Sequence, residues 1–433
     1  MECQQLMSQP VGVEGPSGCG GAEWVDRFDE ARAWEHVRAL SYPRRVGSLG
    51  ERRACRYVRR RLEEYGLECR RERFGVPRRL RALVAWGVMG LCAGLVIGGG
   101  WLWRSAPLGA GVMWLVAAWL VNRPWAWAGR LRRSGEARGI RSANLVATQR
   151  DAALAGAPAR VVFMAHYDTK SQLLPTGLRV GLVYAAMGIC LVLAAAGVAA
   201  AVEPTPDRVS RLAAGYGPWV VVAILGVLAA NVTGNRSPGA LDNATGVGVL
   251  LELARSWRPS AGEPLEVVWV ASGSEEAGLD GAWDFLERHE SWWREKPTLL
   301  VNLDSVGAGD MVYLAGEPGS VALAEEVASR LGIGWARLRV VGAAMDHQPF
   351  AAQGLCAVSL LGDVVRHALV LHSASDRPER VEHAAMRRAG LLAEGVARAW
   401  AARYQRPGRS GSGLSPNTES EIGSRDPGIT AYA

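Results

Sequence analysis

Apolar and polar positions repeat with different periods along this chain, and each change of period marks an element that we expect. Residues 26–40 and 49–65 carry apolar residues at helical spacing among many charges, which predicts two amphipathic helices. Gly66 follows the second helix, as is typical of a helix C-terminus. Residues 68–76 then predict a short β-strand.

Four long stretches contain no charged residue at all. Crossing a bilayer takes roughly 20 apolar residues, so we expect four transmembrane helices. The alternative is four buried core helices, but core helices seldom run this long without a charge. The stretches come in two pairs, which predicts two helical hairpins, residues 83–122 and 180–235, inserted into one domain. The stretches are residues 83–103, 106–122, 180–202 and 212–235.

Arginines flank the first hairpin on the side of the domain, whereas its connecting loop holds only Arg104. The positive-inside rule therefore predicts an integral membrane protein whose globular part lies in the cytoplasm. The loop of the second hairpin holds Arg208 and Arg211 and is less decisive. The flanking residues of the first hairpin are Arg78, Arg79, Arg81, Arg123, Arg130, Arg132 and Arg133.

The composition changes this picture little. The net charge is +7, and lysine occurs only at Lys170 and Lys296. No zinc-finger spacing, RNA-binding aromatic motif or long basic tail is present, so nucleic acid is not an expected partner. The seven cysteines are odd in number and widely spaced, which argues against a disulfide framework and fits a reducing compartment.

The two ends of the chain differ in composition from the segment between them. Residues 1–24 and 405–433 are rich in Gly, Ser and Pro and are expected to be disordered. Between them, residues 25–404 are expected to form one catalytic domain that the two hairpins interrupt.

Four apolar runs of the expected domain each end in acidic or histidine residues. Continuous runs of Val and Leu suit buried strands of a mostly parallel sheet, and sites form beyond the carboxyl ends of such strands. We therefore expect an α/β fold, with a mixed, mostly parallel sheet sandwiched by helices. A fifth segment, residues 241–255, opens a helix. The acidic and histidine residues expected at one edge of the sheet are His166, Asp168, Glu275, Glu276, Asp304 and His372, with Asp242 at the start of the fifth segment.

These residue types suit a pair of metal ions. Imidazole and carboxylate are good zinc ligands, and other divalent metals accept the same ligands. His166 and Asp168 are two positions apart on a strand end, so Asp168 can hydrogen-bond the ring nitrogen that does not bind metal. Glu275 and Glu276 are adjacent and point apart, so one can bind metal while the other accepts a proton. Taken singly, each residue has a commoner structural role, such as helix capping by Asp242.

The motifs AHYDT, LDNATGVGVLLELAR, SGSEEAGLDGA, NLDSVG, MDHQPFAAQG and HSASDRPERVE together resemble the co-catalytic zinc aminopeptidases of the MH clan. That group includes bacterial leucyl-type aminopeptidases and glutamate carboxypeptidase, and the resemblance covers most of the chain outside the hairpins and tails. It implies an aminopeptidase that hydrolyses N-terminal residues from peptides with two zinc ions. His166 and Asp304 would bind one zinc and Glu276 and His372 the other. Asp242 would bridge both, with Glu275 as general base and Asp168 orienting His166.

Two departures from the family pattern bear on function. Residues 341–350 offer no tyrosine as an oxyanion stabiliser; His347 is a candidate, and the alternative is a structural histidine beside Asp346. The second hairpin separates His166 from Asp242, so the site should lie close to the bilayer and act on membrane-associated or hydrophobic peptides. The rival hypotheses are a catalytically silent receptor and a cyclase or amidohydrolase on the same fold. The sequence does not set the oligomeric state.

Overall fold

The computed structural model describes Cys3 and residues 27–121, 140–149, 156–202, 208–258, 265–338 and 344–404. The segments that were expected to be disordered, residues 1–24 and 405–433, lie outside the described residues, apart from Cys3.

An eight-stranded mixed sheet forms the centre of the domain, in the order β1-β2-β4-β3-β5-β8-β6-β7. The four central strands, β4, β3, β5 and β8, are parallel, and antiparallel pairs lie toward both edges. The predicted mixed, mostly parallel sheet is confirmed. The bounds are β1 Glu68–Val76, β2 Ile140–Thr148, β3 Ala159–His166, β4 Leu265–Ser272, β5 Thr298–Asp304, β6 Met311–Gly316, β7 Gly334–Arg337 and β8 Ala357–Leu361.

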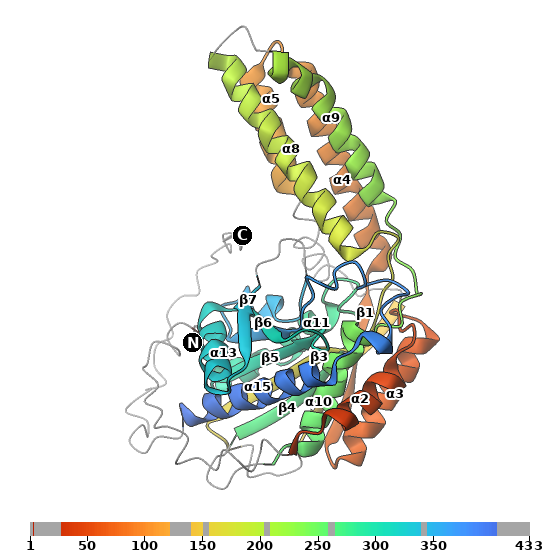
Figure 1. The fold of residues 1–433 in the computed structure, drawn as a ribbon, viewed down its shortest axis with the longest axis vertical. Coiled ribbons are helices and arrows are strands. Elements are labelled where there is room, and N and C mark those ends of the chain that lie inside the picture. The colour runs from red at the N-terminus through yellow and green to blue at the C-terminus, as the bar shows by residue number, and fades with distance from the viewer. Residues whose placement is uncertain are drawn as a thin grey trace.

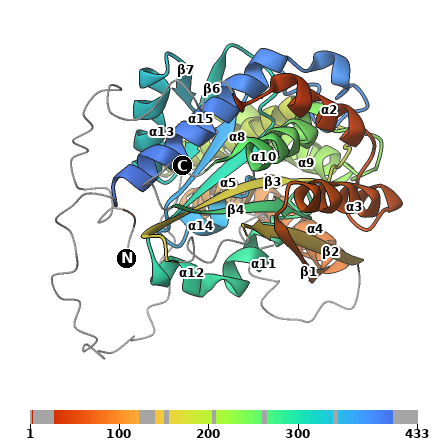
Figure 2. The ribbon, with the colours of Figure 1, turned by 90° about the horizontal axis from the view of Figure 1, so that it is seen from below.

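Helices cover both faces of this sheet (Figure 2). Strand β3 shows why, because its side chains alternate between two apolar cores. Phe163 packs into the larger core, and Met164 packs on the opposite side with Phe285 and Phe350. One face carries α2 Glu30–Leu40, α3 Leu49–Glu64, α10 Thr245–Ser256, α13 Pro318–Arg330 and α15 His383–Ala402. The other carries α11 Asp280–Arg288, α12 Glu290–Glu295 and α14 Gln348–Ala351.

The first predicted helix starts later than its periodicity indicates. Asp29 is its N-cap, and its carboxylate accepts hydrogen bonds from the backbone N–H groups of Ala31 and Arg32. The helix therefore begins at Glu30, whereas the second runs from Leu49 to Glu64, as predicted to within one residue.

The uncharged stretches form four helices that stand together as one bundle on the domain (Figure 1). Small residues let the helices approach closely, as in membrane bundles. A Cβ at Gly197 would lie 3.1 Å from the Cα of Gly111, and a Cβ at Gly99 would meet the Trp114 ring. The bounds are α4 Arg78–Leu102, α5 Pro107–Val121, α8 Thr176–Val202 and α9 Arg208–Ala229.

The helix boundaries correct the predicted hairpins. The first hairpin starts at Arg78 instead of residue 83, because arginine is a good helix former and continues the helix below the apolar run. The second starts at Thr176, and its last helix ends at Ala229, so that residues 230–235 leave the helix. Three of the helices, α4, α8 and α9, are long and apolar enough to cross a membrane by length and composition, whereas the described part of α5 has 15 residues.

The described cysteines include one disulfide-bonded pair, although the sequence argues against a disulfide framework. Cys3 and Cys356 form a disulfide, although they are 353 positions apart along the chain. Such a pairing cannot be seen from local spacing, because Cys356 lies at the start of β8 and only the fold brings Cys3 to it. The other described cysteines, at positions 55, 69, 92 and 190, are free.

Candidate metal centre

Parallel strands deliver the predicted residues to one edge of the sheet. Strand β3 ends at His166 and β5 ends at Asp304. The last residue of β4, Ser272, lies opposite His166 in the register, and Glu275 and Glu276 follow within four residues. The carboxyl ends of three neighbouring strands therefore frame the site.

Two groups of ligand-type atoms form there, and Asp242 belongs to both. In the first group, His166 Nε2 lies 3.2 Å from Asp242 Oδ1 and 3.8 Å from Asp304 Oδ1. In the second group, His372 Nε2 lies 2.9 Å from Asp242 Oδ2 and 3.2 Å from Glu276 Oε2. Each oxygen of Asp242 thus faces a different histidine.

These distances fit a pair of divalent cations. Oxygen and nitrogen ligands lie about 2.0–2.2 Å from zinc, so two ligands of one tetrahedral ion are roughly 3.3 Å apart. The separations within the two groups scatter around that value. A carboxylate that offers one oxygen to each group has the arrangement of a bridging ligand.

Asp242 is held by its neighbours in a fixed position. The backbone N–H groups of Leu241 and Asp242 both donate to the carboxylate of Asp376, at 2.6 and 3.1 Å. Asn243 follows a cis peptide bond and accepts from the N–H of Ser305, next to Asp304. The loops that carry Asp242 and Asp304 are therefore tied together.

Asp168 holds the loop that carries the two glutamates. Its two carboxylate oxygens accept from the backbone N–H groups of Glu275 and Glu276, at 3.1 and 3.2 Å. The carboxylate lies 3.7 Å from His166 Nδ1, beyond hydrogen-bond distance, whereas the main-chain oxygen of Asp168 lies 3.3 Å from that nitrogen. The side chain therefore positions the Glu275–Glu276 loop, and the main chain faces the ring.

The pKa values of the adjacent Glu275 and Glu276 are shifted in opposite directions. Burial raises the pKa of Glu275 well above its ordinary value, and the nearby carboxylates of Glu276, Asp346 and Asp304 raise it further. Burial also opposes ionisation of Glu276, but His372 and Lys170 outweigh it and hold the pKa of Glu276 at about 2. Carboxyl groups that are driven apart in this way suit different tasks, one as a proton acceptor and one as an ionised ligand.

Sequence reasoning missed two side chains beside the second group. Lys170 Nζ lies 2.6 Å from Glu276 Oε2. Thr176, the first residue of α8, places its hydroxyl 2.8 Å from His372 Nδ1, the ring nitrogen that faces away from Asp242. The signal for Lys170 was its rarity, because a chain that uses arginine almost everywhere carries only two lysines.

Arg44 is a third missed residue. Its guanidinium is fully buried and donates to the main-chain oxygens of Tyr167, Pro238 and Gly239, among others. Those carbonyls belong to the segments that precede Asp168 and Asp242. Arg44 therefore links the loop before Asp168 to the loop before Asp242 through hydrogen bonds to their main-chain oxygens. No local sequence motif distinguishes Arg44 from the other arginines of the chain.

His347 and Asp346 lie outside both ligand groups. His347 Nδ1 is 2.6 Å from the Ser359 hydroxyl, and burial lowers the pKa of His347 to about 4, so the ring is neutral. Asp346 accepts a hydrogen bond from the Ser272 hydroxyl, and burial raises its pKa to about 7. These contacts agree with the structural alternative for His347.

Part of the chain, including most of this site, matches the model of a known protein family. Residues 226–397 match the model of peptidase family M28, and this stretch includes Asp242, Glu275, Glu276, Asp304 and His372. The matched stretch covers 172 of the 433 residues and agrees with the predicted class, a hydrolase of a zinc peptidase family.

Two curated relatives share parts of the sequence. The alkaline phosphatase isozyme conversion protein of Escherichia coli is 37% identical over 84 residues, which are 19% of this chain and 24% of that protein. Aminopeptidase YwaD of Bacillus subtilis is 29% identical over 167 residues, 36% of each chain. The matches thus span about a quarter to a third of the length of these relatives.

Solved structures share the fold at low sequence identity. LapB from Legionella pneumophila has a TM-score of 0.52 at 13% identity, over 91% of this chain and 78% of LapB. BSAP, a zinc aminopeptidase from Bacillus subtilis, has a TM-score of 0.51 at 14% identity, over 86% of this chain and 94% of BSAP. The α/β architecture predicted from the strand pattern is therefore shared with these two solved structures.

Proposed function

Starting from the match to peptidase family M28, we propose that the protein is a membrane-bound two-metal metallopeptidase of the aminopeptidase type. The observation that carries the proposal is the position of Asp242, whose two oxygens face two separate groups of histidine and carboxylate ligands. A structural role for Asp242 alone would not require both groups.

The ligand roles follow from the two groups. His166 and Asp304 would hold one cation, Glu276 and His372 would hold the other, and Asp242, which belongs to both groups, would be a ligand shared between them. Zinc suits these ligands, and other divalent metals are accepted by the same set. Two bound cations would lower the pKa of an attacking water and polarise the scissile carbonyl.

Glu275 is the proposed general base. Its Oε2 lies 4.0 Å from His166 Nε2, so the carboxylate borders the first ligand group without belonging to it. Its raised proton affinity suits a group that takes a proton from water and passes it to the leaving amine. Asp168 keeps Glu275 and Glu276 in place through their backbone N–H groups.

The proposed substrates are peptides, from which the enzyme removes N-terminal residues. Aminopeptidase YwaD and BSAP carry that activity in their names. A receptor without activity on the same fold is disfavoured, because each ligand position of the two groups is filled.

The bundle is the proposed membrane anchor, with all four helices crossing the bilayer. Its outer surface is covered by large apolar side chains, which a surface in contact with water rarely shows as one patch. The exposed residues include Leu83, Trp86, Leu91, Trp101, Leu108, Val112, Leu115, Trp119, Leu191, Val192, Val198, Leu212, Tyr216, Trp219, Val220 and Val227.

The domain is proposed to lie on the cytoplasmic side. Arg78 and Arg79 are exposed at the base of α4, and such a flank of arginines is typical of the cytoplasmic side. Arg81 does not contribute a free charge, because it is buried and paired with Asp280.

A metal analysis combined with a Glu275→Gln variant tests the activity. The full chain, purified with zinc, is expected to hold two metals and to hydrolyse aminoacyl-nitroanilides. Loss of the base should lower kcat by about 10²–10⁴-fold and leave the metal content unchanged. Glu290→Gln, an exposed position, is the matched control. A chain that binds no metal, or a Glu275→Gln variant that keeps full activity, would refute the proposal.

Membrane-associated or hydrophobic peptides are the proposed substrate class. Thr176 and Arg81 connect two helices of the bundle directly to the site loops, so the centre lies beside the base of the bundle. In reconstituted bilayers, a lipid-anchored peptide should be cleaved faster than the same peptide in solution. Equal rates would contradict this choice of substrate but leave the metallopeptidase proposal standing.

A further inference from the structure

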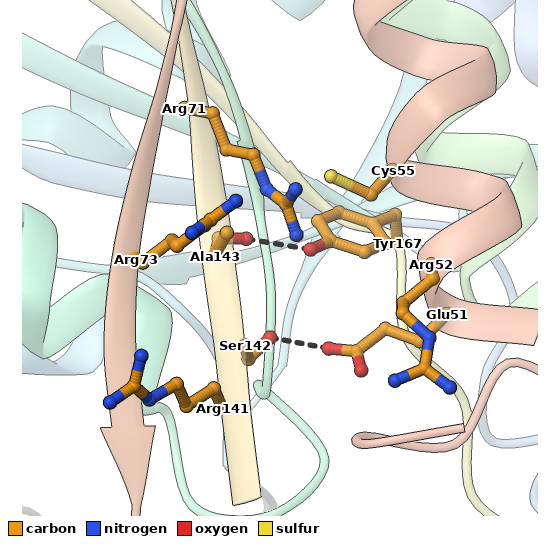
Figure 3. Close-up of a pocket in the computed structure, with 9 residues that line it drawn as sticks. All are labelled: Glu51, Arg52, Cys55, Arg71, Arg73, Arg141, Ser142, Ala143 and Tyr167. Atoms are coloured by element: carbon orange, nitrogen blue, oxygen red, sulfur yellow. Dashed lines mark hydrogen bonds between the residues drawn. The ribbon is translucent and has the colours of Figure 1, made fainter. Parts of the chain in front are cut away.

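A polar cavity that includes none of the candidate metal ligands lies between α3 and strands β1 and β2 (Figure 3). Its volume is about 190 Å³, or roughly six waters at about 30 Å³ each. Pockets for whole organic ligands are larger, about 300–1,000 Å³. The cavity is therefore of a size for a small group, such as one phosphate with part of its ester.

Four arginines line this cavity, and they come from three elements. Arg71 and Arg73 extend from β1, Arg141 from β2 and Arg52 from the first turn of α3. Within the part of the chain that the structure describes, no ion pair joins any of the four to a carboxylate. The cavity thus concentrates guanidinium groups, which match phosphate oxygens in geometry as well as in charge.

Glu51 is the one acidic residue among the lining side chains. Its carboxylate accepts hydrogen bonds from the N–H of Gly47 and from the hydroxyl of Ser142. Burial raises the pKa of Glu51 to about 7, so a substantial share of this carboxyl is protonated at neutral pH. The four arginines are therefore opposed by less than one negative charge.

The charged residues on the two faces of β1 differ in their ion pairing, and the solvation of an edge strand does not explain this difference. Sheet edges often carry charged residues that discourage pairing with other chains, and β1 is an edge strand. On one face, Arg70 pairs with Glu68, and Glu72 pairs with His289. On the face toward the cavity, Arg71 and Arg73 form no ion pair with any residue that the structure describes. Charges placed only for solubility would have no reason to segregate by face.

The cavity also lies near the proposed membrane surface. Strand β1 ends at Val76, and α4 begins at Arg78. Arg141 lies opposite Gly75 in the register, so the cationic end of the cavity is within a few residues of the bundle. Its floor is the ring of Tyr167, between His166 and Asp168 in the chain. Basic pockets beside transmembrane helices are suited to anionic lipid headgroups.

We propose that the cavity lined by Arg52, Arg71, Arg73 and Arg141 is a binding site for a phosphate-bearing anion. This site is separate from the metal centre and does not depend on the peptidase proposal. The two sources of such an anion are the headgroup of an anionic lipid and a free phosphate ester or ion.

Binding to the detergent-solubilised full chain tests the site. The probes are dihexanoyl phosphatidylglycerol, dihexanoyl phosphatidylcholine and inorganic phosphate, followed by titration calorimetry and by native mass spectrometry. Saturable binding of phosphatidylglycerol without binding of phosphate identifies the lipid headgroup as the source. Binding of phosphate with similar affinity identifies a free phosphate. Equal binding of the two lipids would overturn the proposal, because the site would then not distinguish charge.

A charge-matched pair of variants assigns the binding to this cavity. Arg71→Gln combined with Arg73→Gln should weaken binding by at least tenfold. Arg59→Gln combined with Arg70→Gln removes the same charge from α3 and β1 outside the cavity and should leave affinity unchanged. Should the first variant fold poorly, Arg141→Gln alone is expected to weaken binding by a smaller factor. Equal affinities across these variants, or no saturable binding in the parent chain, would overturn the proposal.

Discussion

Lys170 helps to keep the carboxyl group of Glu276, a candidate metal ligand, in its ionised form. Glu276 is buried, and burial alone would favour its protonated form, which binds cations poorly. His372 and the ammonium group of Lys170, which lies 2.6 Å from Glu276 Oε2, both favour the ionised form. Lys170 is therefore a positioning residue for this ligand.

Replacing Lys170 with Met should lower kcat/KM by about 10–100-fold, the range typical for partners of metal ligands. The retained metal should also be released at lower chelator concentration, an effect that a purely structural role would not predict. Lys296→Met is the matched control, since Lys296 pairs with Glu266 at the far end of β4. Equal chelator sensitivity in the two variants would contradict a role at Glu276.

Among the site residues, the sequence identifies those that lie at the ends of predicted strands. His166 and Asp304 are the last residues of β3 and β5, so an apolar run followed by a polar residue was enough to find them. Arg44, Asn243 and Asp376 act through main-chain groups of distant segments. Such contacts depend on which loops meet, and a pattern along one chain does not contain that information.

Helix α4 of the bundle is bonded to the loop that carries Glu275 and Glu276. Arg81 donates to Asp280 at 2.6 Å and to the main-chain oxygen of Ala277 at 2.8 Å. Asp280 also accepts from the hydroxyl of Ser274, the residue before Glu275. A buried, two-pronged ion pair thus links the bundle to the site.

Arg81→Gln should destabilise the fold by about 3–5 kcal/mol, because the buried Asp280 carboxylate would lose its cationic partner. It should also lower kcat in the molecules that remain folded, since the Ser274–Glu275 turn loses its support. Thermal unfolding and steady-state kinetics measure the two effects. Arg79→Gln, an exposed neighbour, should stay within about 0.5 kcal/mol of the parent. An Arg81→Gln protein as stable as this control would show that the pair does not hold the loop.

The packing of α2 on α3 gives a pH-dependent prediction. His36 on α2 is buried between the hydroxyls of Tyr57 and Tyr65, at 2.8 and 3.0 Å from its two ring nitrogens. Burial, assisted by nearby arginines, lowers the pKa of His36 to about 4. The unfolded chain protonates this group near pH 6.5. Stability from His36 is therefore complete above pH 6.5 and is lost as the pH falls toward 4.

His36→Gln keeps a donor and an acceptor but cannot titrate. Between pH 7 and pH 5 the parent should lose about 2 kcal/mol of unfolding free energy that the variant retains. Chemical unfolding at the two pH values measures the difference, with His367→Gln as a control at a less buried histidine. A loss of the same size in parent and His36→Gln would refute the assignment.

For the whole molecule, composition and hydrophobic periodicity predicted the individual helices and strands better than the way in which they pack together. Uncharged length identified the hairpins, and runs of Val and Leu identified the parallel strands. The joining of both hairpins into one bundle depends on close contacts such as Gly111 against Gly197, which involve residues too small to mark a pattern. The disulfide between Cys3 and Cys356 depends likewise on the completed fold.

If the bundle anchors the protein in a membrane as proposed, the orientation of the domain and the state of that disulfide are physically linked. If the arginines at the base of the bundle hold the domain in the cytoplasm, glutathione and thioredoxin keep thiols there reduced. Cys3 and Cys356 should then be free thiols in living cells and pair only after lysis or oxidation. The loop around Arg104, at the opposite end of α4, should be reachable from outside the cell.

Two measurements on the same cells test this linkage. Acid quenching followed by a maleimide polymer counts the free thiols, with Cys3→Ser and Cys356→Ser assigning the gel shifts. An epitope inserted between Arg104 and Ser105 reports the accessible side in intact cells. Reduced thiols together with an accessible epitope are the expected result. A disulfide already present in the cell, together with an epitope that is protected until lysis, would place the domain outside and show that the arginine flanks do not set the orientation of this chain.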